Sequence, residues 1–319
     1  MKPEHHEDIT HSEIHYDKNI VNYKGISPSR FSSELSSWLE KLAPVNIDFV
    51  LEGETGTGKD TFARALYHLS RCEGPFIAIN CAAIPENLAE NELFGSVAGA
   101  FTGSTRHRIG HIESADKGIL FLDEIDSMSL TLQAKLLRVL ETRSVMRLGS
   151  TETHPVHLRV IAAAQQPLAK MVEAGSFRSD LYFRLTTVRI ALPALRNQVE
   201  TIVPAFKRFA AEAAIQFKRP LPPVSQSLTE ALLMHQWPGN MRELKAASMR
   251  YVLGLPALDH SRSHPHNWNL RDRMNLIEQC LIQDCLIRHD NQVNEAADEL
   301  GIPARTLYNK LKSMNEKVN

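Results

Sequence analysis

The sequence has few cysteines and no long apolar run, and both absences narrow the kinds of protein it can be. Its 319 residues include four cysteines, and no two of these have the Cys-x-x-Cys spacing of a zinc or redox site. Sparse cysteines of this kind predict reduced, buried thiols in a cytosolic protein. No apolar run approaches the roughly 18 residues that a membrane helix needs, and the N-terminus has no apolar signal segment. We therefore expect a cytoplasmic protein without a membrane span.

A surplus of positive charge is also missing. Lys and Arg total 36 against 37 Asp and Glu, which gives a formal net charge of −1. The charge of the whole chain gives no sign of nucleic-acid binding, so any contact with DNA must come from a local patch. Hydrophobic residues make up 43% of the chain and charged residues 23%, as in ordinary globular proteins.

Composition and pattern divide the chain into five segments. Residues 1–24 are polar and predict a mobile tail, whose histidines lack the regular Cys or carboxylate spacing of a metal site. Residues 25–190 alternate short apolar runs with helical patterns. Residues 191–255 are helical by pattern, 256–270 resemble a linker, and 271–319 form a last helical unit.

Four apolar runs are the predicted strands of the second segment. They cover residues 47–51, 75–79, 119–122 and 158–162. Helical patterns lie between them, the clearest over residues 130–141. Alternating strands and helices predict a parallel sheet covered on both faces, so the expected fold class is α/β, followed by all-α units.

A glycine-rich turn follows the first predicted strand and opens a helix. It consists of Gly53, Glu54, Thr55, Gly56, Thr57, Gly58, Lys59, Asp60 and Thr61. Phosphate-binding loops need this context, because backbone N–H groups, a helix N-terminus and a lysine then surround the phosphates. The usual pattern has Ser or Thr after the lysine to contact magnesium, and Asp60 stands there instead. The alternative is a glycine-rich turn with an incidental lysine.

A second motif ends the predicted strand 119–122 with Asp123 and Glu124. A buried strand would deliver Asp123 at its carboxyl end, where it can hold Mg²⁺. Glu124 suits a base that orients or polarises the attacking water. Two such motifs in one α/β stretch seldom coincide by chance, so the sequence predicts an NTP hydrolase.

Between these motifs, an aromatic residue lies among small ones. The stretch includes Gly99, Ala100, Phe101, Thr102, Gly103 and Ser104. It closely resembles the GAFTGA loop of the bacterial enhancer-binding proteins, the AAA+ activators of sigma-54 RNA polymerase, with serine in place of the final alanine. Most AAA+ proteins lack this insertion, so the resemblance is specific, and it covers roughly residues 24–255. It implies that ATP is the nucleotide and that these six residues contact sigma-54.

The resemblance implies roles for four further residues. Asn80 matches the asparagine that couples nucleotide state to Glu124. Arg178 and Arg184 match arginine fingers that reach the nucleotide of a neighbouring subunit, where a cation would stabilise charge on the transferring phosphoryl group. Arg242 matches the arginine of the AAA+ helical lid that senses nucleotide. The alternative for the two fingers is that they make only surface ion pairs.

One departure from the family concerns the sensor after the fourth strand. Residues 162–165 read Ala-Ala-Ala-Gln, where the family normally reads Ala-Ala-Thr-Asn. The polar sensor is thus partly missing, and only Gln165 is carried forward. This departure keeps open a second hypothesis, a DNA-binding co-regulator with a weak or silent ATPase that acts in a mixed ring with a paralogue.

The last segment has helix-turn-helix spacing, because Gly301 ends one helix and Pro303 opens the next. It resembles the Fis-like unit of the same activators. The residues expected to face the DNA groove or the phosphates are Arg305, Thr306, Asn309 and Lys310. The alternative is a helical hairpin used for oligomer packing.

The sequence therefore predicts a sigma-54-dependent activator that binds upstream enhancer DNA and hydrolyses ATP in a ring, expected to be a hexamer. Hydrolysis would drive the RNA polymerase holoenzyme from the closed to the open promoter complex. With no long sensory segment ahead of the resemblance, the chain looks most like the hypersensitive-response regulators of plant-pathogenic bacteria, which implies control of type III secretion genes. Control would then come from expression level or from a separate regulatory protein. Another AAA+ remodeller is disfavoured by the loop at 99–104 and by the C-terminal unit.

Overall fold

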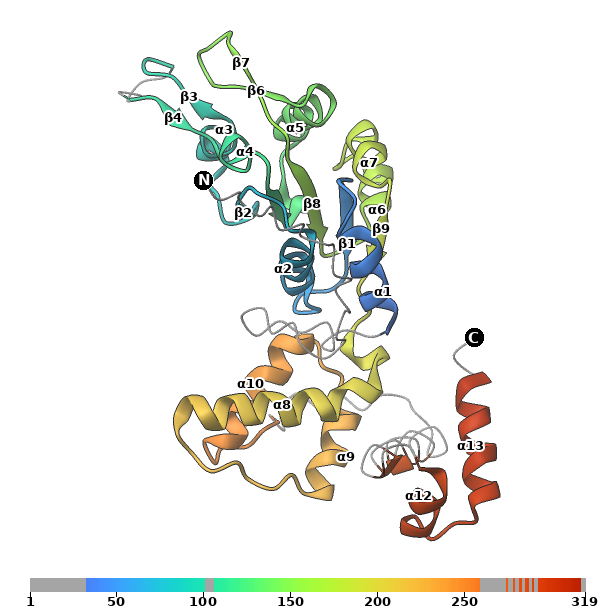
Figure 1. The fold of residues 1–319 in the computed structure, drawn as a ribbon. Helices are drawn as coiled ribbons and strands as arrows, with labels where there is room; N and C mark the ends of the chain where they lie inside the picture. Colours follow the sequence, from blue (N-terminus) through green and yellow to red (C-terminus); the bar gives the residue numbers. More distant parts are fainter. Residues whose placement is uncertain are drawn as a thin grey trace, which may run out of the picture.

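The computed structural model describes residues 33–100, 106–258 and 292–316, with single positions between the last two ranges. Those positions are 274, 278, 281, 282, 285, 286 and 289, and side chains are described as far as Leu311 except at Ser33 and Asn87. Figure 1 shows an α/β unit, a helical unit below it, and the C-terminal helices beside the latter. The predicted tail and most of the predicted linker lie outside the described residues.

Five parallel strands form the central sheet, in the order β2-β5-β8-β1-β9. They are β1 (Phe49–Glu52), β2 (Phe76–Asn80), β5 (Ile119–Asp123), β8 (Arg159–Ala164) and β9 (Arg189–Ala191). The parallel pairing confirms the predicted fold class. β9 was not predicted, because only Ile190 of its three residues is buried and so short an edge strand leaves no apolar run.

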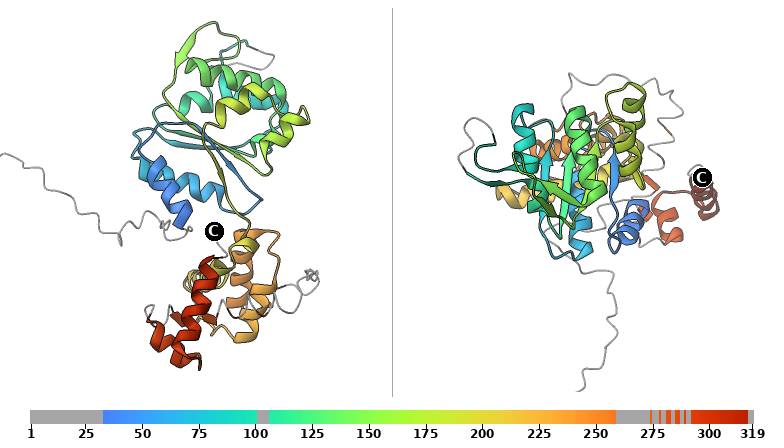
Figure 2. Two further views of the ribbon diagram at one scale, coloured as in Figure 1. Left: turned by 90° about the vertical axis from the view of Figure 1, so that its right-hand side faces the viewer. Right: turned by 90° about the horizontal axis from the view of Figure 1, so that it is seen from above.

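Helices cover both faces of the sheet, because alternate residues of a strand point to opposite sides. Phe49 and Leu51 pack on the face covered by α1 (Ser33–Leu42) and α2 (Lys59–Ser70), whereas Val50 faces the other side. The helices on that other side are α3 (Glu86–Phe94), α4 (His111–Ser114), α5 (Leu130–Thr142), α6 (Leu168–Glu173) and α7 (Ser179–Leu185). The two further views in Figure 2 show the same layers.

Two short hairpins project from the α/β unit next to each other. They consist of β3 (Gly95–Ser96) with β4 (Arg108–Ile109) and of β6 (Ser144–Met146) with β7 (Thr153–Pro155). Val97 N–H donates to Leu148 O at 3.0 Å, and Leu148 N–H donates to Gly95 O at 2.9 Å. The second hairpin therefore supports the base of the segment that was predicted to contact sigma-54.

A helical unit follows the sheet. It contains α8 (Val199–Phe217), α9 (Gln226–Met234) and α10 (Asn240–Val252), preceded by a 3-10 turn, η3 (Leu195–Asn197). Trp237 is fully buried at its centre, and its indole Nε1 donates to Leu232 O at 2.9 Å. The unit therefore has its own core, and residues 195–258 contain no strand, as the sequence pattern predicted.

The C-terminal unit contains α12 (Val293–Glu299) and α13 (Ala304–Glu316). Gly301 has φ +66° between them, a left-handed conformation that favours glycine. Ala296, Ala297 and Leu307 are buried in a small core together with Cys285. The two helices and their turn have the helix-turn-helix arrangement that the spacing predicted.

The described cysteines form no disulfide. Cys285 is fully buried, as expected, whereas Cys72 and Cys81 are half-buried, and Cys280 lies outside the described residues. Within the described part of the chain, no helix combines the length and the apolar character that crossing a membrane requires.

Candidate nucleotide site and DNA-binding unit

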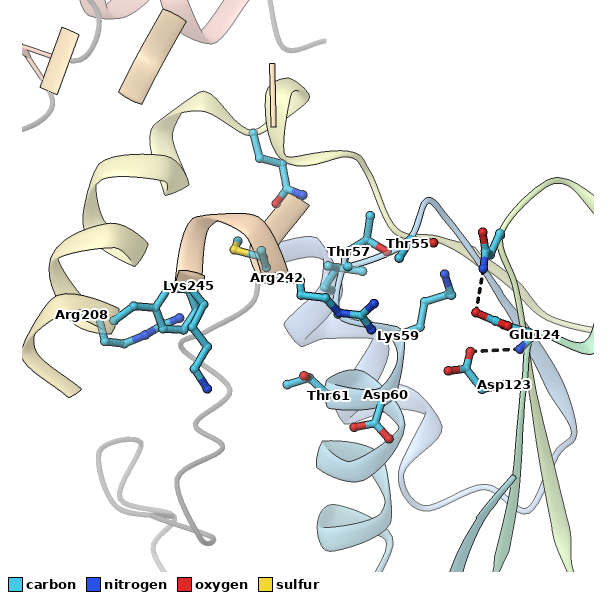
Figure 3. A pocket seen from close by; sticks show the side chains of 17 residues that line it. Thr55, Thr57, Lys59, Asp60, Thr61, Asp123, Glu124, Arg208, Arg242 and Lys245 are labelled. Atoms are coloured by element: carbon cyan, nitrogen blue, oxygen red, sulfur yellow. Dashed lines mark hydrogen bonds between the residues drawn. The ribbon is translucent and has the colours of Figure 1, made fainter. Parts of the chain in front are cut away.

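A cleft of about 330 Å³ opens at the carboxyl ends of the parallel strands, between the sheet and the helical unit (Figure 3). Crevices at this end of open parallel sheets are the usual ligand sites of α/β folds. The residues that line it from the glycine-rich turn are Thr55, Gly56, Thr57, Gly58, Lys59, Asp60 and Thr61. Asp123 and Glu124 line the same cleft from β5, Gln165 from the end of β8, and Arg242 from α10. The structure thus brings together residues that are far apart in the sequence.

The glycine-rich turn has a shape that needs glycine at two positions. Gly56 has φ +78°, and a Cβ added there would lie 2.3 Å from Gly239 O. Gly58 has φ +104° and is the residue before the first turn of α2. With these two bends, the turn presents the N-terminus of α2 to the cleft, an arrangement that favours a phosphate group.

Lys59 is 8% exposed and lies across the turn. Its ammonium donates to the carbonyl oxygens of Gly53 and Glu54, the latter at 3.1 Å. Burial lowers the pKa of Lys59, and the nearby carboxylates, Asp123 first among them, act in the opposite direction. The lysine is therefore the cation that faces the acidic end of β5.

Asp123 and Asp126 are carboxyl groups whose burial raises their pKa above the usual range. Lys59 acts in the opposite direction on both. Asp123 Oδ1 accepts the N–H of Glu124 at 3.0 Å, and Glu124 itself has a left-handed backbone with φ +54°. Backbone hydrogen bonds also lower the two pKa values, from Glu124 for Asp123 and from Asp126 and Gln165 for Asp126. Half-buried carboxylate oxygens gathered in this way are suited to a bound cation.

Gln165 is the direct side-chain partner of Glu124 in the described part of the chain. It follows β8 immediately, and its amide Nε2 donates to Glu124 Oε1 at 2.7 Å (Figure 3). The position at which the sequence departs from the family thus still carries a polar group that reaches the site.

Asn80 has a different local arrangement from the one its predicted role suggests. It ends β2 in register with Asp123, but its Oδ1 accepts the N–H groups of Ala82 at 2.9 Å and Ala83 at 3.1 Å. The side chain therefore closes a turn after the strand. Its coupling to Glu124 stays a prediction.

Three contacts join the glycine-rich turn to the helical unit. Glu54 accepts two hydrogen bonds from Arg196, and these, against the effect of burial, lower its pKa to about 2. Asn240 donates from Nδ2 to Thr55 O at 3.0 Å and to Glu54 at 3.2 Å. The N–H of Met241 donates to Gly56 O at 3.0 Å.

Arg196, Asn240 and two further cations of the cleft were not predicted from the sequence. Arg208 from α8 and Lys245 from α10 line it on the side of the helical unit (Figure 3). Residues 54 and 196 are 142 positions apart, so no local spacing could have indicated that they meet.

The two predicted finger arginines lie on α7 or directly before it, outside the cleft of their own chain. Arg178 is exposed, and its guanidinium makes two hydrogen bonds to Asp180, at 3.0 Å and 2.7 Å. Arg184 donates to Leu140 O at 3.0 Å and lies 3.3 Å from the carboxylate of buried Asp48. Their role toward another subunit stays a prediction.

Of the residues predicted to contact sigma-54, Gly99 and Ala100 are described. Ala100 N–H donates to Val97 O at 3.2 Å, so the chain turns at the base of the segment. Phe101, Thr102, Gly103 and Ser104 lie outside the described residues.

The predicted DNA-contacting residues lie on the first turns of α13. Arg305 and Asn309 are exposed, and Thr306 is half-buried. Lys310 is half-buried and pairs with Glu278 at 2.7 Å. Tyr308 is 59% exposed between them and was missed, because an aromatic residue in a helical pattern suggests core packing rather than an exposed contact.

Three family models match the chain along most of its length. The sigma-54 interaction domain matches residues 26–191, the AAA+ ATPase lid domain 196–259, and the bacterial regulatory protein of the Fis family 273–314. The chain belongs to the sigma-54-dependent AAA+ transcription activators. α8, α9 and α10 are therefore the lid of this activator, and α12 and α13 belong to its Fis-type DNA-binding unit.

Similar curated proteins include regulators of pathogenicity loci. The activator is 53% identical over 296 residues to the probable regulatory protein WtsA of Pantoea stewartii subsp. stewartii, with 92% of both chains covered. It is 52% identical over 278 residues to HrpS of Pseudomonas syringae pv. syringae, which covers 86% of this chain and 92% of HrpS.

Similar solved structures include NtrX from Brucella abortus. Its complex with ADP has a TM-score of 0.67 and 28% identity, and covers 92% of this chain and 71% of NtrX. Its complex with ATP has a TM-score of 0.66 and 29% identity, and covers 88% of this chain and 67% of NtrX.

Proposed function

We propose that this activator hydrolyses ATP in the cleft and uses the energy to move sigma-54 RNA polymerase holoenzyme from the closed to the open promoter complex. The observation that carries the proposal is the convergence of Lys59, Asp123, Glu124 and Arg242 on one cleft. The similarity to NtrX structures that hold ADP and ATP supports nucleotide binding there.

The residues of the cleft fit a magnesium ion. Asp123 and Asp60 both line it, and carboxylate oxygens are ligands that Mg²⁺ prefers. Asp60 accepts two hydrogen bonds from Arg64, at 3.0 Å and 2.8 Å, which leaves Asp123 as the proposed direct ligand. A bound magnesium would supply positive charge that offsets the phosphates and the acidic end of β5.

Each residue of the cleft has a separate task in the proposed hydrolysis. Lys59 turns from the carbonyls of its own loop toward the phosphates, and the N–H groups of residues 55–60 surround them. Glu124 orients the attacking water, and the amide of Gln165 holds its carboxylate in place. Arg242 reports the nucleotide to the lid.

The arrangement of α7 supports assembly into a ring. Arg178 and Arg184 do not line their own cleft, and the aromatic side chain of Phe183 between them is 73% exposed. An exposed apolar group beside two cations suits a contact with the next subunit, whose nucleotide the arginines would reach. We propose a hexamer, in which a paralogue can take part.

Residues 99–104 are the proposed contact with sigma-54. The β6–β7 hairpin supports their base, because Leu148 is hydrogen-bonded to the backbone of Gly95 and Val97. The Fis-type unit would hold the ring at an upstream enhancer. By similarity to WtsA and HrpS, we propose that the target genes belong to a pathogenicity locus, such as one for type III secretion. The activator would act in the bacterial cytoplasm. A separate regulatory protein would control it.

A weak or silent ATPase is not favoured. That hypothesis depended on the altered sensor after β8, and Gln165 still places an amide on Glu124 from this position. An ATPase assay of the purified chain over a range of concentrations tests it, since a ring-forming enzyme gains specific activity as subunits associate.

The decisive experiment separates the loop from the ATPase. Phe101→Ala and Thr102→Ala should each leave thermal stability, ATP hydrolysis and DNA binding near wild type, but abolish open-complex formation at a sigma-54 promoter. The control is Glu124→Gln, which should lose both hydrolysis and open complexes. Full promoter opening by the loop variants would contradict the assigned contact, and a joint loss of stability and hydrolysis would mean that these residues only pack the loop.

A further inference from the structure

Three metal-capable side chains of different kinds converge in the Fis-type unit. Cys285, His289 and Glu299 place one ligand atom each within 4.8 Å of one another. Thiolate, imidazole and carboxylate together are a ligand set that suits zinc, and soft sulfur disfavours magnesium and calcium. None of the three residues takes part in the proposed ATPase or in the predicted DNA contacts.

The spacing of these residues explains why they meet. The N–H of His289 donates to Cys285 O at 3.2 Å, so these two residues lie close together. Glu295 and Glu299 are four positions apart on α12, a step that keeps side chains on one face of a helix. The thiol of Cys285 donates to Ala296 O at 3.5 Å, so it lies against α12. The two pairs therefore face each other.

His289 lies between two carboxylates. Its Nε2 is 2.6 Å from Glu299 Oε2, and its Nδ1 is 3.4 Å from Glu295 Oε2. In metal sites, a histidine that binds through one nitrogen commonly donates its other N–H to a carboxylate, which orients the ring. Glu295 stands in that second position.

We propose that Cys285, His289 and Glu299 bind one zinc-class divalent ion, with Glu295 as the orienting carboxylate and a water as fourth ligand. Zinc ligands lie 2.0–2.3 Å from the metal, which places tetrahedral ligand atoms about 3.3–3.8 Å apart. The observed separations are at most 4.8 Å, and the shortest is the 2.6 Å hydrogen-bonded pair of His289 and Glu299. Rotation of the side chains brings the longer separations into this range, and the hydrogen-bonded pair opens as the ion enters. The thiol gives up its proton when the ion binds.

The ion would join the residues before α12 to the first helix of the DNA-binding unit. The core there is small, with Ala296, Ala297 and Cys285 buried beside Ile282, Leu286 and Leu307, so apolar burial contributes limited stability. A bound metal would order this unit and hold α13 in place for DNA.

Titration of the full-length, metal-free chain with Co²⁺, in the absence of nucleotide, tests the site. Cobalt is the probe because thiolate coordination gives a sulfur-to-metal charge-transfer absorption that carboxylates and histidines do not. All proteins carry His5→Asn, His6→Asn, His11→Asn and His15→Asn, so that the N-terminal histidines do not compete. We expect one cobalt per chain, the charge-transfer band, and displacement by Zn²⁺.

Single substitutions then assign the ligands. Cys285→Ser should abolish the band, and Glu299→Gln should weaken binding at least tenfold, whereas Glu295→Gln should weaken it by about 10- to 100-fold and keep the band. Cys72→Ser and Cys81→Ser are the matched controls and should bind as the parent does. The proposal is overturned if the parent shows no charge-transfer band, or if Cys285→Ser binds cobalt as tightly as the parent while circular dichroism shows both folded.

Discussion

The amide of Gln165 donates a hydrogen bond to the carboxylate of Glu124, with 2.7 Å between Nε2 and Oε1. The first residue stands at the end of β8 and the second at the end of β5, which are neighbours in the sheet. The pairing restrains the one acidic side chain that we assign to the attacking water. Gln165 is also a position at which this chain departs from the Ala-Ala-Thr-Asn pattern of its family.

Loss of this hydrogen bond should slow the chemical step. We expect Gln165→Ala to reduce single-turnover ATP hydrolysis by about tenfold to a hundredfold, which corresponds to the loss of a hydrogen bond to a charged group, with nucleotide affinity nearly unchanged. Gln165→Asn should recover part of the rate if its shorter amide reaches Glu124. Asn80→Ala is the comparison for the family's usual coupling residue. An unchanged single-turnover rate in Gln165→Ala would show that the contact does not position Glu124.

Lys59 and Glu124 should separate binding from turnover. Lys59→Ala removes the cation of the phosphate loop, so nucleotide binding should be lost. Glu124→Gln keeps the shape of the side chain but not its basicity, so the nucleotide should bind and remain uncleaved. Binding of a fluorescent ATP analogue and release of phosphate measure the two effects. Hydrolysis near the wild-type rate in Glu124→Gln would remove that residue from the mechanism.

The substitutions Arg178→Ala and Arg184→Ala should change the free energy of unfolding by different amounts, although we expect each of them to abolish hydrolysis. Arg184→Ala removes one cation from buried Asp48, while Arg143 still binds it at 2.5 Å, so we expect a loss of roughly 1–2 kcal/mol in unfolding free energy. Arg178→Ala removes only an exposed pair and should leave stability unchanged. Urea unfolding measures the stability of both variants.

Mixing either variant with Lys59→Ala should restore some ATPase activity. If rings shown to contain both variants do not recover activity, this would argue against arginine fingers that act between subunits.

The stabilisation that the ion pair between Glu54 and Arg196 contributes should depend on pH. Folding lowers the pKa of Glu54 from 4.5 to about 2, so the contact stabilises the protein fully above pH 4.5 and is lost as the pH falls toward 2. The difference in urea midpoint between wild type and Glu54→Gln should therefore be constant from pH 7 to 5 and shrink below pH 4.5. A difference that grows on acidification would contradict this assignment.

Arg305 and Lys310 should contribute unequally to DNA binding. Arg305 is exposed on α13, and Arg305→Ala should weaken binding to a specific site by about tenfold to a hundredfold if it contacts a base edge. Lys310 pairs with Glu278, so its substitution should have the smaller effect. Footprinting titrations at constant salt compare them. Equal effects would indicate that both contact phosphates.

The parts of the fold that the sequence predicted are those with local signals. β5 is a run of buried residues that ends in Asp123, and the turn before α2 needs glycine, so both were visible in the sequence. β9 has one buried residue in three, which leaves no apolar run, and its ion pair between Arg189 and Glu52 joins residues too far apart in the sequence to form a pattern.

The same distinction holds for the site. Motif residues were predicted because their spacing is local, whereas Arg196 and Asn240 meet Glu54 only after the lid folds back on the sheet. Asn80 illustrates the reverse case, in which a motif residue makes a local contact that the motif did not predict. Its side chain closes a turn within its own segment, and this turn competes with the longer-range role that the family suggests.

The backbone contact at Gly56 has a kinetic consequence. A bare peptide group of the phosphate loop accepts the N–H of Met241 from the lid, and no side chain fits between Gly56 and Gly239 O. We expect this hydrogen bond between lid and phosphate loop to break before spent nucleotide leaves the cleft. Release of ADP, rather than cleavage of ATP, should then limit the rate of steady-state turnover, and opening of the lid would determine how often each subunit completes a cycle.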